Sequence, residues 1–462
     1  MLTSLFAYRH LCMRFILYAA ITIPFQYIIM SRLPYTGDEP HYLMTVISLL
    51  KDHDLNLYNN YSEKDFNYIG YSDLTPQIAI RDSFIPPEHG FGFPLLMVAP
   101  FWLLGIGGTR LVLVVLSYIT LLLIAAICER MTNKARVGTL AGFILAASPT
   151  WQVHASRFFP ENVAGLLFCL VILLMLHLMN EHRQHWLVFT LGVLVAFCPV
   201  LYLKYTVIGM ALFMASLFIR NIRTNMAYYA GVLVVAGCGL YVWLNTYGLS
   251  IAGAGGSPTH DFVLTGMFDR FWQPWFDRQH GLLTLQPVYL LSFWAIPHHI
   301  FTRHADSRSL LLWVSLAVGA YAVMYGLFLG SPGASMPGRY LCAALPLLSM
   351  LLSTWVFERG PQNWVRRYGV YLLLLPGIAF IGGSVLTSRV PWELLPQFYK
   401  ALFFPYWSSG PTVAPSDARY ISFLLIGLVV LTKALTVWRS KARSQNCSLA
   451  KSVAPAGWRG RP

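Results

Sequence analysis

Two adjacent carboxylates, Asp38 and Glu39, stand in the motif "YTGDEPHY", directly after the first long apolar stretch. A carboxylate in such a place can take the proton of an attacking hydroxyl group. We interpret Asp38 as that general base and Glu39 as a residue that orients Asp38 or holds a cation. The alternative is structural, because aspartate is a good N-cap and Pro40 would fall in the first turn of a following helix.

A further acidic residue, Glu161, lies in "ASPTWQVHASRFFPENVAGLL", a short segment between two apolar stretches. We predict that Glu161 is the second carboxylate of the same site, with Arg157 and His154 beside it in the sequence. The alternative is a simple ion pair between Glu161 and Arg157.

Two basic residues are candidates for binding an anionic leaving group. Lys204 stands in "LYLKYT", between two apolar stretches, and Arg339 in the glycine- and proline-rich "GSPGASMPGRYL". Backbone amides and a guanidinium together suit phosphate, since arginine can donate two parallel hydrogen bonds. The alternative for Lys204 is a side chain that only reaches the headgroup level of a membrane.

Acidic and histidine residues of the predicted outer loops offer a possible divalent metal site. The candidates are Glu39, Glu88, His89, His260 and His280. No spacing among them dictates a site, such as two histidines four apart on one helix face. We therefore expect most of them to be surface residues and no certain cofactor, with a metal left as the alternative. The chain has no Walker-type loop and no dinucleotide fingerprint, which argues against nucleotide use.

The elements that must position these residues are membrane-spanning helices. Of the 462 residues 56% are apolar and only 11% charged, whereas about a quarter of the residues of a soluble domain are charged. Apolar runs of about 18 residues or more can cross the hydrocarbon core as helices. We predict an all-α polytopic membrane protein with about twelve spans, at residues 15–31, 109–128, 137–150, 162–179, 187–203, 206–219, 226–246, 283–301, 309–329, 341–357, 368–387 and 419–438.

The stretch from 187 to 219 is too long for one span, at about 1.5 Å per residue. We expect it to break where Pro199 and Lys204 stand. The short first segment, with Arg9 and Arg14 ahead of apolar residues, is predicted to be a retained signal-anchor.

Lysine and arginine stay on the cytoplasmic side during membrane insertion, so they indicate the topology. With the N-terminus inside, inner segments hold 20 of the 33 basic and 4 of the 19 acidic residues, and outer segments hold the rest. The inner net charge is then +16 and the outer −2, which together give the +14 of the chain. The basic balance is therefore explained by topology, without a nucleic-acid partner.

The longest outer loop runs from residue 32 to 108, so we expect the chemistry there. Apolar residues Tyr42, Val46, Leu49 and Leu50 follow the acidic pair at helical spacing, which predicts an amphipathic helix in the membrane interface. The loop ends in "FGFPLLMVAPFWLLGIGG", which we expect to lie in the interface or dip into the membrane. We predict a membrane domain over residues 1–438 and a disordered basic cytoplasmic tail over 439–462.

These motifs resemble the GT-C superfamily of polyprenyl-phosphate-sugar-dependent glycosyltransferases, such as bacterial lipid A aminoarabinose transferases and protein O-mannosyltransferases. In that family an acidic pair opens the first outer loop, as "GDEPHY" does here. "PPEHGFGFPLLMVAPFWLLG" resembles the end of that loop, and "FDRQHGLLTLQPVYLL", which contains Arg278, resembles a recurrent bacterial element. The resemblance implies that Arg278 and His41 also face the donor phosphate.

Two positions depart from the aminoarabinose transferases. His41 stands where they have an arginine, and Phe93 where they have a lysine. The way in which this chain binds phosphate is therefore expected to differ from theirs.

The resemblance implies an inverting glycosyltransferase that takes a sugar from a polyprenyl phosphate and passes it to a lipid, glycan or protein acceptor. It would act at the periplasmic face of the bacterial inner membrane. One alternative is a transporter or flippase of lipid-linked saccharides, but such proteins tend to have two related halves and charges near the midplane. Another is an O-antigen polymerase or ligase, which would rely on arginines of late loops.

Overall fold

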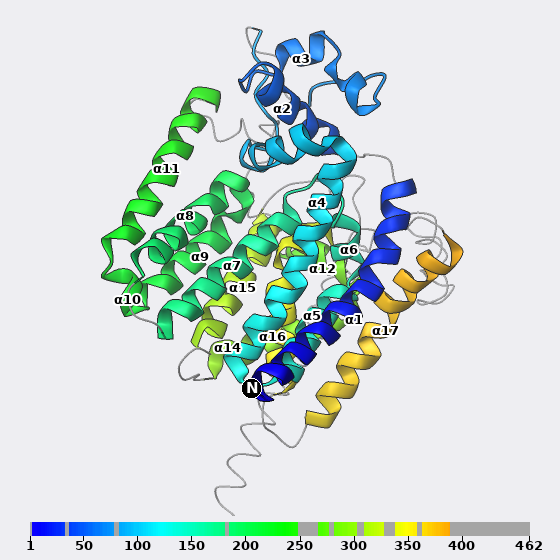
Figure 1. Cartoon of the computed structure of the whole chain (residues 1–462), viewed down its shortest axis with the longest axis vertical. Coiled ribbons are helices and arrows are strands. Elements are labelled where there is room, and N and C mark those ends of the chain that lie inside the picture. The colour runs from blue at the N-terminus through cyan, green and yellow to red at the C-terminus, as the bar shows by residue number, and fades with distance from the viewer. Residues whose placement is uncertain are drawn as a thin grey trace, which may run out of the picture. The chain divides into compact units, whose positions relative to one another are not determined.

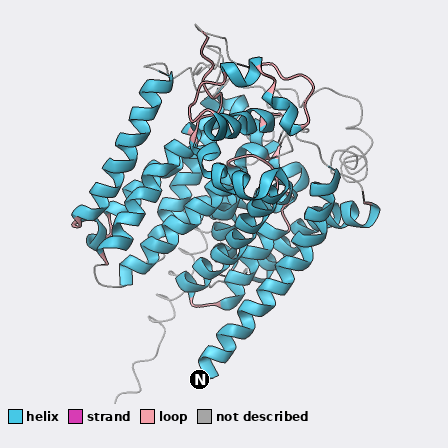
Figure 2. Cartoon of the chain, turned by 45° about the horizontal axis from the view of Figure 1, so that its top comes forward, coloured by secondary structure: helices cyan, strands magenta, loops and turns pink. Residues whose placement is uncertain are grey.

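The computed structural model describes residues 2–32, 37–77, 83–180, 184–247, 267–276, 281–302, 309–327, 338–357 and 363–388. Within these ranges every regular element is a helix and no strand occurs, so the predicted all-α class is confirmed (Figure 2). The chain forms two compact units, Met1–Thr412 and Val413–Pro462. The second unit, with the predicted last span and the basic tail, lies outside the described residues.

The first half of the chain contains a long first helix, a group of short helices and then a run of apolar helices (Figure 1). The elements are α1 Leu2–Arg32, α2 Glu39–Lys51, α3 Tyr58–Ser62, η1 Asp65–Ile69, α4 Gly92–Thr132, α5 Ala135–Ala146, α6 Pro149–His154, α7 Glu161–Asn180, α8 His185–Leu201, η2 Leu203–Tyr205, α9 Thr206–Leu217, α10 Arg220–Arg223 and α11 Met226–Tyr247.

The second half adds shorter and more broken helices. They are α12 Met267–Phe276, α13 Leu282–Leu285, η4 Pro287–Leu291, α14 Ser292–Phe301, α15 Leu310–Leu327, η6 Arg339–Ala344, α16 Leu345–Val356 and α17 Asn363–Thr387. In Figure 1, α2 and α3 lie at one end of the helical body, opposite the N-terminus of α1.

Six stretches of helix in the described residues are long and apolar enough to cross a membrane. They are Cys12–Ser31, Gly92–Thr132, Glu161–Met179, Met226–Tyr247, Arg339–Val356 and Arg366–Thr387. Four shorter apolar helices accompany them, at Ala135–Ala146, His185–Leu201, Leu203–Leu217 and Leu310–Tyr325. The protein is thus an integral membrane protein, whereas the count of about twelve spans stays a prediction.

The expected break between residues 187 and 219 is present. Helix α8 ends at Leu201, the short η2 contains Lys204, and α9 begins at Thr206. The predicted span at 283–301 is not one helix, because α13, η4 and α14 follow one another there. Pro287 lacks a backbone N–H and so cannot continue the hydrogen bonding of α13.

Helix α4 consists of two parts that meet at Gly105, whose dihedral angles of φ 64° and ψ −169° are not helical. In the first part Trp102, Leu103 and Leu104 are 73%, 66% and 57% exposed. Exposed apolar side chains favour lipid contact, and the interfacial position expected for this segment from the sequence stays a prediction. The structure shows it as a helix continuous with the span apart from this kink.

Helix α2 begins at Glu39 as expected, but its surroundings differ from the prediction. All of Glu39–Ser48 is buried, and Leu49 and Leu50 are half-buried, so the helix has no continuous exposed apolar face for the membrane interface. The prediction of an interfacial amphipathic helix is therefore wrong for α2. It packs on α4 and η1.

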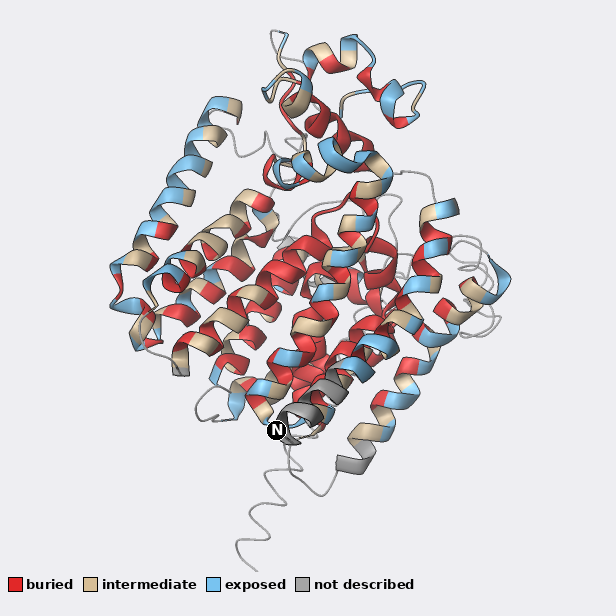
Figure 3. Cartoon of the chain, in the orientation of Figure 1, coloured by how far each residue is buried: buried red, intermediate tan, exposed pale blue. Residues whose placement is uncertain are grey.

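The buried core runs through α5, α7 and α16, whereas α11, α1 and α17 present many exposed residues (Figure 3). Glycines allow close approach between neighbouring helices. A Cβ atom on Gly192 of α8 would lie 2.3 Å from the carbonyl oxygen of Tyr228 in α11, and one on Gly92 of α4 would lie 2.1 Å from that of Val200 in α8. The second contact fixes the start of α4 against α8.

Candidate active site

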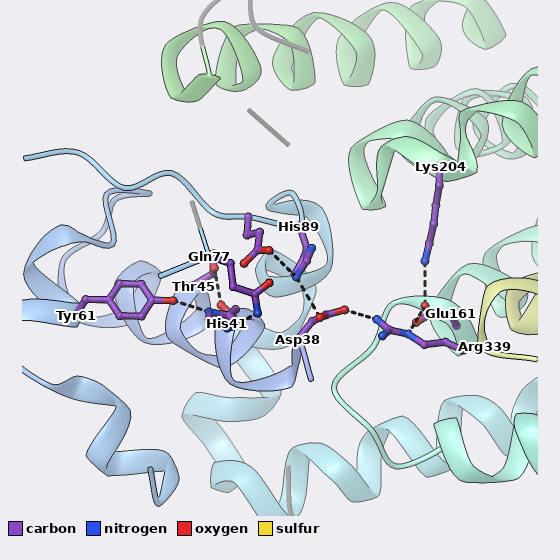
Figure 4. A network of polar contacts seen from close by, with 10 residues as sticks. Asp38, His41, Thr45, Tyr61, Gln77, His89, Glu161, Lys204 and Arg339 are labelled. Carbon is purple, nitrogen blue, oxygen red and sulfur yellow. Dashed lines mark hydrogen bonds and ion pairs between the residues drawn. The ribbon is translucent and has the colours of Figure 1, made fainter. Parts of the chain in front are cut away.

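Four charged side chains meet in an alternating chain of carboxylates and cations. Asp38 Oδ2 accepts a hydrogen bond from Arg339 Nη2 at 2.5 Å, and Glu161 Oε1 lies 3.4 Å from Arg339 Nε and 3.0 Å from Lys204 Nζ. Figure 4 shows Arg339 between the two carboxylates and Glu161 between the two cations. The site therefore brings together four of the residues selected from the sequence.

Each of the four residues lies at or beside a helix end. Asp38 occupies the N-cap position of α2, Glu161 is the first residue of α7, and Lys204 lies in η2 between α8 and α9. Arg339 begins η6 directly after Gly338, which adopts the left-handed conformation with φ 79°. Glycine tolerates that conformation without a steric penalty, so the turn can direct Arg339 toward the site.

The four side chains differ in their access to solvent. The Glu161 side chain is 1% exposed, those of Lys204 and Arg339 are both 14% exposed, and that of Asp38 is 24% exposed. Glu161 is thus a buried counter-charge beneath two cations. Asp38, Lys204 and Arg339 are each partly exposed.

Arg339 determines the protonation of Asp38. Burial by itself raises the pKa of the carboxyl, but the guanidinium of Arg339 and the nearby His89 outweigh burial and hold the pKa of Asp38 well below its usual range. The guanidinium also lies 4.0 Å from the centre of the Phe159 ring, a cation–π contact. Asp38 is therefore an ionised carboxylate, although a weak base while Arg339 holds it.

Glu39 faces away from this cluster. Its side chain is completely buried, forms an ion pair with Arg157, and accepts a hydrogen bond from the backbone N–H of Phe158 at 2.8 Å. Glu39 thereby fastens α2 to the turn between α6 and α7. The alternative ion pair between Arg157 and Glu161 is wrong, because Arg157 pairs with Glu39 while Glu161 pairs with Lys204 and Arg339.

His41 is engaged in a separate hydrogen-bonding network. Its Nδ1 lies 2.6 Å from the Tyr61 hydroxyl, and its Nε2 donates to the Gln77 side chain at 2.9 Å. Because both ring nitrogens contact protein groups, the structure does not place His41 against the phosphate candidates Arg339 and Lys204. Its role in phosphate binding stays a prediction.

Glu88 and His89 lie beside Asp38 on the loop before α4. His89 Nε2 is 3.6 Å from Asp38 Oδ1 and 3.7 Å from Glu88 Oε1. Burial, and then the charge of Asp38, raise the pKa of Glu88 to about 8, and burial lowers that of His89 to about 4. Within the described residues no group of three or more histidine, cysteine or acidic residues has the arrangement of a metal site. Metal binding stays a prediction.

Three of the predicted residues, Arg278, His260 and His280, lie outside the described residues. Arg110 was not predicted from the sequence; its guanidinium donates to the backbone oxygens of Ser156, Met30 and Ile29. This buried arginine ties the end of α1 to α4 and to the turn before α7. Its position near the start of an apolar span was the signal that could have identified it.

Comparisons with known proteins found a matching family model and similar solved structures. Residues 101–243 match the family model of dolichyl-phosphate-mannose-protein mannosyltransferases. The fold is similar to that of ArnT from Cupriavidus metallidurans in the apo state (14% identity, TM-score 0.48) and bound to undecaprenyl phosphate (15% identity, TM-score 0.50). Each similarity covers 93% of this chain and 72% of that chain. No curated protein matches the sequence.

The family-model match and the ArnT-like fold together confirm the resemblance to GT-C membrane glycosyltransferases. The family model covers the region from α4 to α11, which includes Glu161 and Lys204. Asp38 and Arg339 lie outside the matched region, so their roles depend on the geometry of this chain.

Proposed function

We propose that the protein is an inverting glycosyltransferase that moves a sugar from a polyprenyl phosphate to a hydroxyl group of a lipid, glycan or protein. The proposal rests on the GT-C-like membrane fold and on the match to a family model whose description names a lipid-phosphate-linked sugar, dolichyl-phosphate-mannose. The similar ArnT structure with bound undecaprenyl phosphate supports a polyprenyl phosphate as the lipid part of the donor.

The observation that carries the proposal is the alternating cluster of Asp38, Arg339, Glu161 and Lys204. A sugar on a polyprenyl phosphate has a leaving group that departs as a phosphate without being protonated. The site must therefore stabilise the negative charge that accumulates on the leaving phosphate. Arg339 and Lys204 are two neighbouring cations, 3.4 Å and 3.0 Å from one carboxylate oxygen, which holds them together for that role.

The buried Glu161 explains how two cations can be kept together in the absence of donor. Two cations that lie close together repel each other in a medium of low dielectric constant. The carboxylate between them removes that repulsion and still leaves each cation partly exposed. We assign Glu161 to positioning the two cations, which refines its predicted role as the second carboxylate.

Asp38 is the base of the proposed reaction. It is more exposed than Glu161 and belongs to the loop after α1 that the sequence analysis selected. The carboxylate would take the proton of the acceptor hydroxyl as the new glycosidic bond forms, a contribution of about 10² to 10⁴ in rate for positioned proton transfer. We place the reaction at the periplasmic face of the bacterial inner membrane, in accordance with the predicted topology.

The test is transfer of a sugar from an undecaprenyl-phosphate-linked donor to a hydroxyl acceptor by the purified protein and by Asp38→Asn. Asparagine keeps the shape of the side chain, so the protein should fold. We expect kcat to fall by about 10² or more, while the donor KM stays equal or falls, because the uncharged side chain no longer competes with phosphate for Arg339.

Asp54→Asn is the matched control, because Asp54 is an exposed aspartate of the same loop and accepts its hydrogen bonds through Oδ1, which asparagine retains. This variant should transfer at the wild-type rate. If Asp38→Asn keeps its activity within a few-fold, the assignment of the base is wrong. If the wild type moves the lipid-linked sugar across the membrane without transferring it, a flippase is the better description.

A further inference from the structure

A buried ring nitrogen without a hydrogen bond lies beside the proposed base. His89 Nε2 is shielded from solvent and has no hydrogen-bond partner. It faces Asp38 Oδ1 at 3.6 Å and Glu88 Oε1 at 3.7 Å, distances just beyond a hydrogen bond. An unsatisfied buried polar atom is costly, and such atoms call for an explanation.

The position of the imidazole is fixed by its surroundings. The ring packs on Tyr42, with 5.2 Å between ring centres, and is stacked on Tyr202 at 6.3 Å. The loop that carries it is held by the Tyr247 hydroxyl of α11, which donates to the backbone oxygen of Pro87 at 2.7 Å. Since the ring is held on both sides, Asp38 is the partner that would have to move.

The two oxygens of Asp38 face different groups. Oδ2 is bound by Arg339, and Oδ1 faces His89 across the remaining gap (Figure 4). In the proposed function Arg339 must bind the donor phosphate. A phosphate at Arg339 competes directly with Asp38 for the guanidinium, because both are anions that bind its N–H groups.

We propose that His89 is a positioning residue for Asp38, whose Nε2–H binds Asp38 Oδ1 once the donor phosphate has taken Arg339. This inference rests on the proposed function and deepens it. The imidazole is neutral, because burial lowers its pKa to about 4, and a neighbouring carboxylate selects the tautomer with the proton on Nε2. His89 Nε2, which has no hydrogen-bond partner in the structure, thus gains Asp38 Oδ1 as its partner when the donor is bound.

The exchange would give Asp38 the properties that a base needs. A neutral N–H stabilises a carboxylate less than a guanidinium does, so Asp38 becomes more basic when it passes from Arg339 to His89. In the reaction the acceptor oxygen forms a bond to the anomeric carbon and its proton passes to Asp38. The bond from that carbon to the phosphate oxygen breaks, and the electron pair leaves with the phosphate held by Arg339 and Lys204.

Two neighbouring side chains, His41 and Glu88, do not fit this positioning role. Both ring nitrogens of His41 already contact Tyr61 and Gln77. Both carboxyl oxygens of Glu88 contact the Gln77 amide nitrogen. His89 is the donor whose free nitrogen faces Asp38.

The test compares two substitutions of His89 in the purified full-length protein. His89→Phe keeps an aromatic ring for the contacts with Tyr42 and Tyr202 but removes the donor. His89→Gln keeps an N–H donor near the position of Nε2. Transfer from an undecaprenyl-phosphate-linked sugar and binding of undecaprenyl phosphate itself are measured for both.

We expect His89→Phe to lower kcat by about tenfold or more and to weaken undecaprenyl phosphate binding, because the hydrogen bond to Asp38 forms only in the donor complex. We expect His89→Gln to restore most of both losses. A merely structural role would not be rescued by glutamine. His53→Asn, an exposed histidine of the same loop with φ 60°, should retain wild-type activity, since asparagine tolerates that conformation.

A wild-type kcat in His89→Phe would overturn this inference, as would a loss in His89→Gln equal to that in His89→Phe. Either result would leave the proposed function standing, because the wild type would still transfer the sugar. Absence of transfer by the wild type, with the donor and a hydroxyl acceptor present, would overturn the proposed function and this inference with it.

Discussion

Glu88 is an acid that the folded protein keeps uncharged. Burial, followed by the charge of Asp38, raises its pKa from the ordinary value of 4.5 to about 8. Between these two values the unfolded chain has lost the proton while the folded protein retains it, so this residue makes the folded state less stable as the pH rises. Above about pH 8 both states are ionised and the penalty stays constant.

We therefore predict that Glu88→Gln stabilises the protein in a pH-dependent manner. The gain should be small near pH 5 and reach about 1 kcal/mol or more at pH 8, because one pKa unit corresponds to about 1.4 kcal/mol. The measurement is the unfolding midpoint in detergent at several pH values. The exposed Asp73→Asn serves as control and should show no such trend. A gain that is independent of pH would mean that Glu88 is ionised throughout.

For Asp38, rules that use only neighbouring residues in the sequence predicted the backbone position but not the partner of the side chain. The sequence placed Asp38 at the N-cap of a helix with Pro40 in its first turn, and the structure confirms both positions. The side chain makes no capping hydrogen bond, however, and binds Arg339 instead. Capping rules consider neighbours in sequence, whereas Arg339 lies 301 residues away along the chain.

At the scale of elements, the backbone conformation of Gly338 directs Arg339, the phosphate-binding candidate at the start of η6, toward the site. Its φ of 79° favours glycine, and a Cβ atom there would lie 2.7 Å from Leu282 Cδ1 and 3.0 Å from Thr150 Oγ1. We predict that Gly338→Ala raises the donor KM about tenfold, since strain of about 1 to 3 kcal/mol would displace Arg339. Steady-state kinetics with varied donor concentration measure this effect.

Gly107→Ala is the matched control for this prediction. Gly107 lies in α4, has no positive φ, and a Cβ atom there would meet nothing within 4 Å. Alanine favours helix over glycine, so the control should be neutral or slightly more stable. An unchanged donor KM in Gly338→Ala would show that η6 accommodates the side chain without moving Arg339.

Helix boundaries set by local chemistry were predictable, and those set by tertiary contacts were not. The break between α8 and α9 follows from the length of the apolar run and from Pro199 and Lys204, and it is present. The burial of all residues of α2 from Glu39 to Ser48 was missed because hydrophobic periodicity assumes that polar positions face solvent. In α2 the polar positions are buried against other elements; Glu39, for example, pairs with Arg157 of the turn before α7.

At the scale of the whole molecule, the candidate site is assembled from four separate places in the chain. Asp38, Glu161, Lys204 and Arg339 were each selected from sequence, because their residue types and motifs suit proton transfer or phosphate binding beside apolar spans. Which cation would pair with which carboxylate could not be predicted, since the pairs join α2 with η6 and α7 with η2. Helix packing determines those pairs, and a single sequence does not specify it.

The orientation of this assembly in the membrane gives the last prediction. Positive charge is concentrated on the predicted inner segments, and the site lies at the end of the helical body that carries α2 and α3 (Figure 1). Both Ser62 and Ser83 are exposed there, whereas the exposed Thr224 lies between α10 and α11 on a predicted inner segment. We predict that cysteines introduced at Ser62 and Ser83 react with a membrane-impermeant thiol reagent in intact spheroplasts, and one at Thr224 only after lysis. The exposed Cys12 and Cys238, and Cys447 of the predicted inner tail, must first be replaced by serine, because they would otherwise react. Labelling of Thr224→Cys in intact spheroplasts, with Ser62→Cys protected, would show that the site faces the cytoplasm.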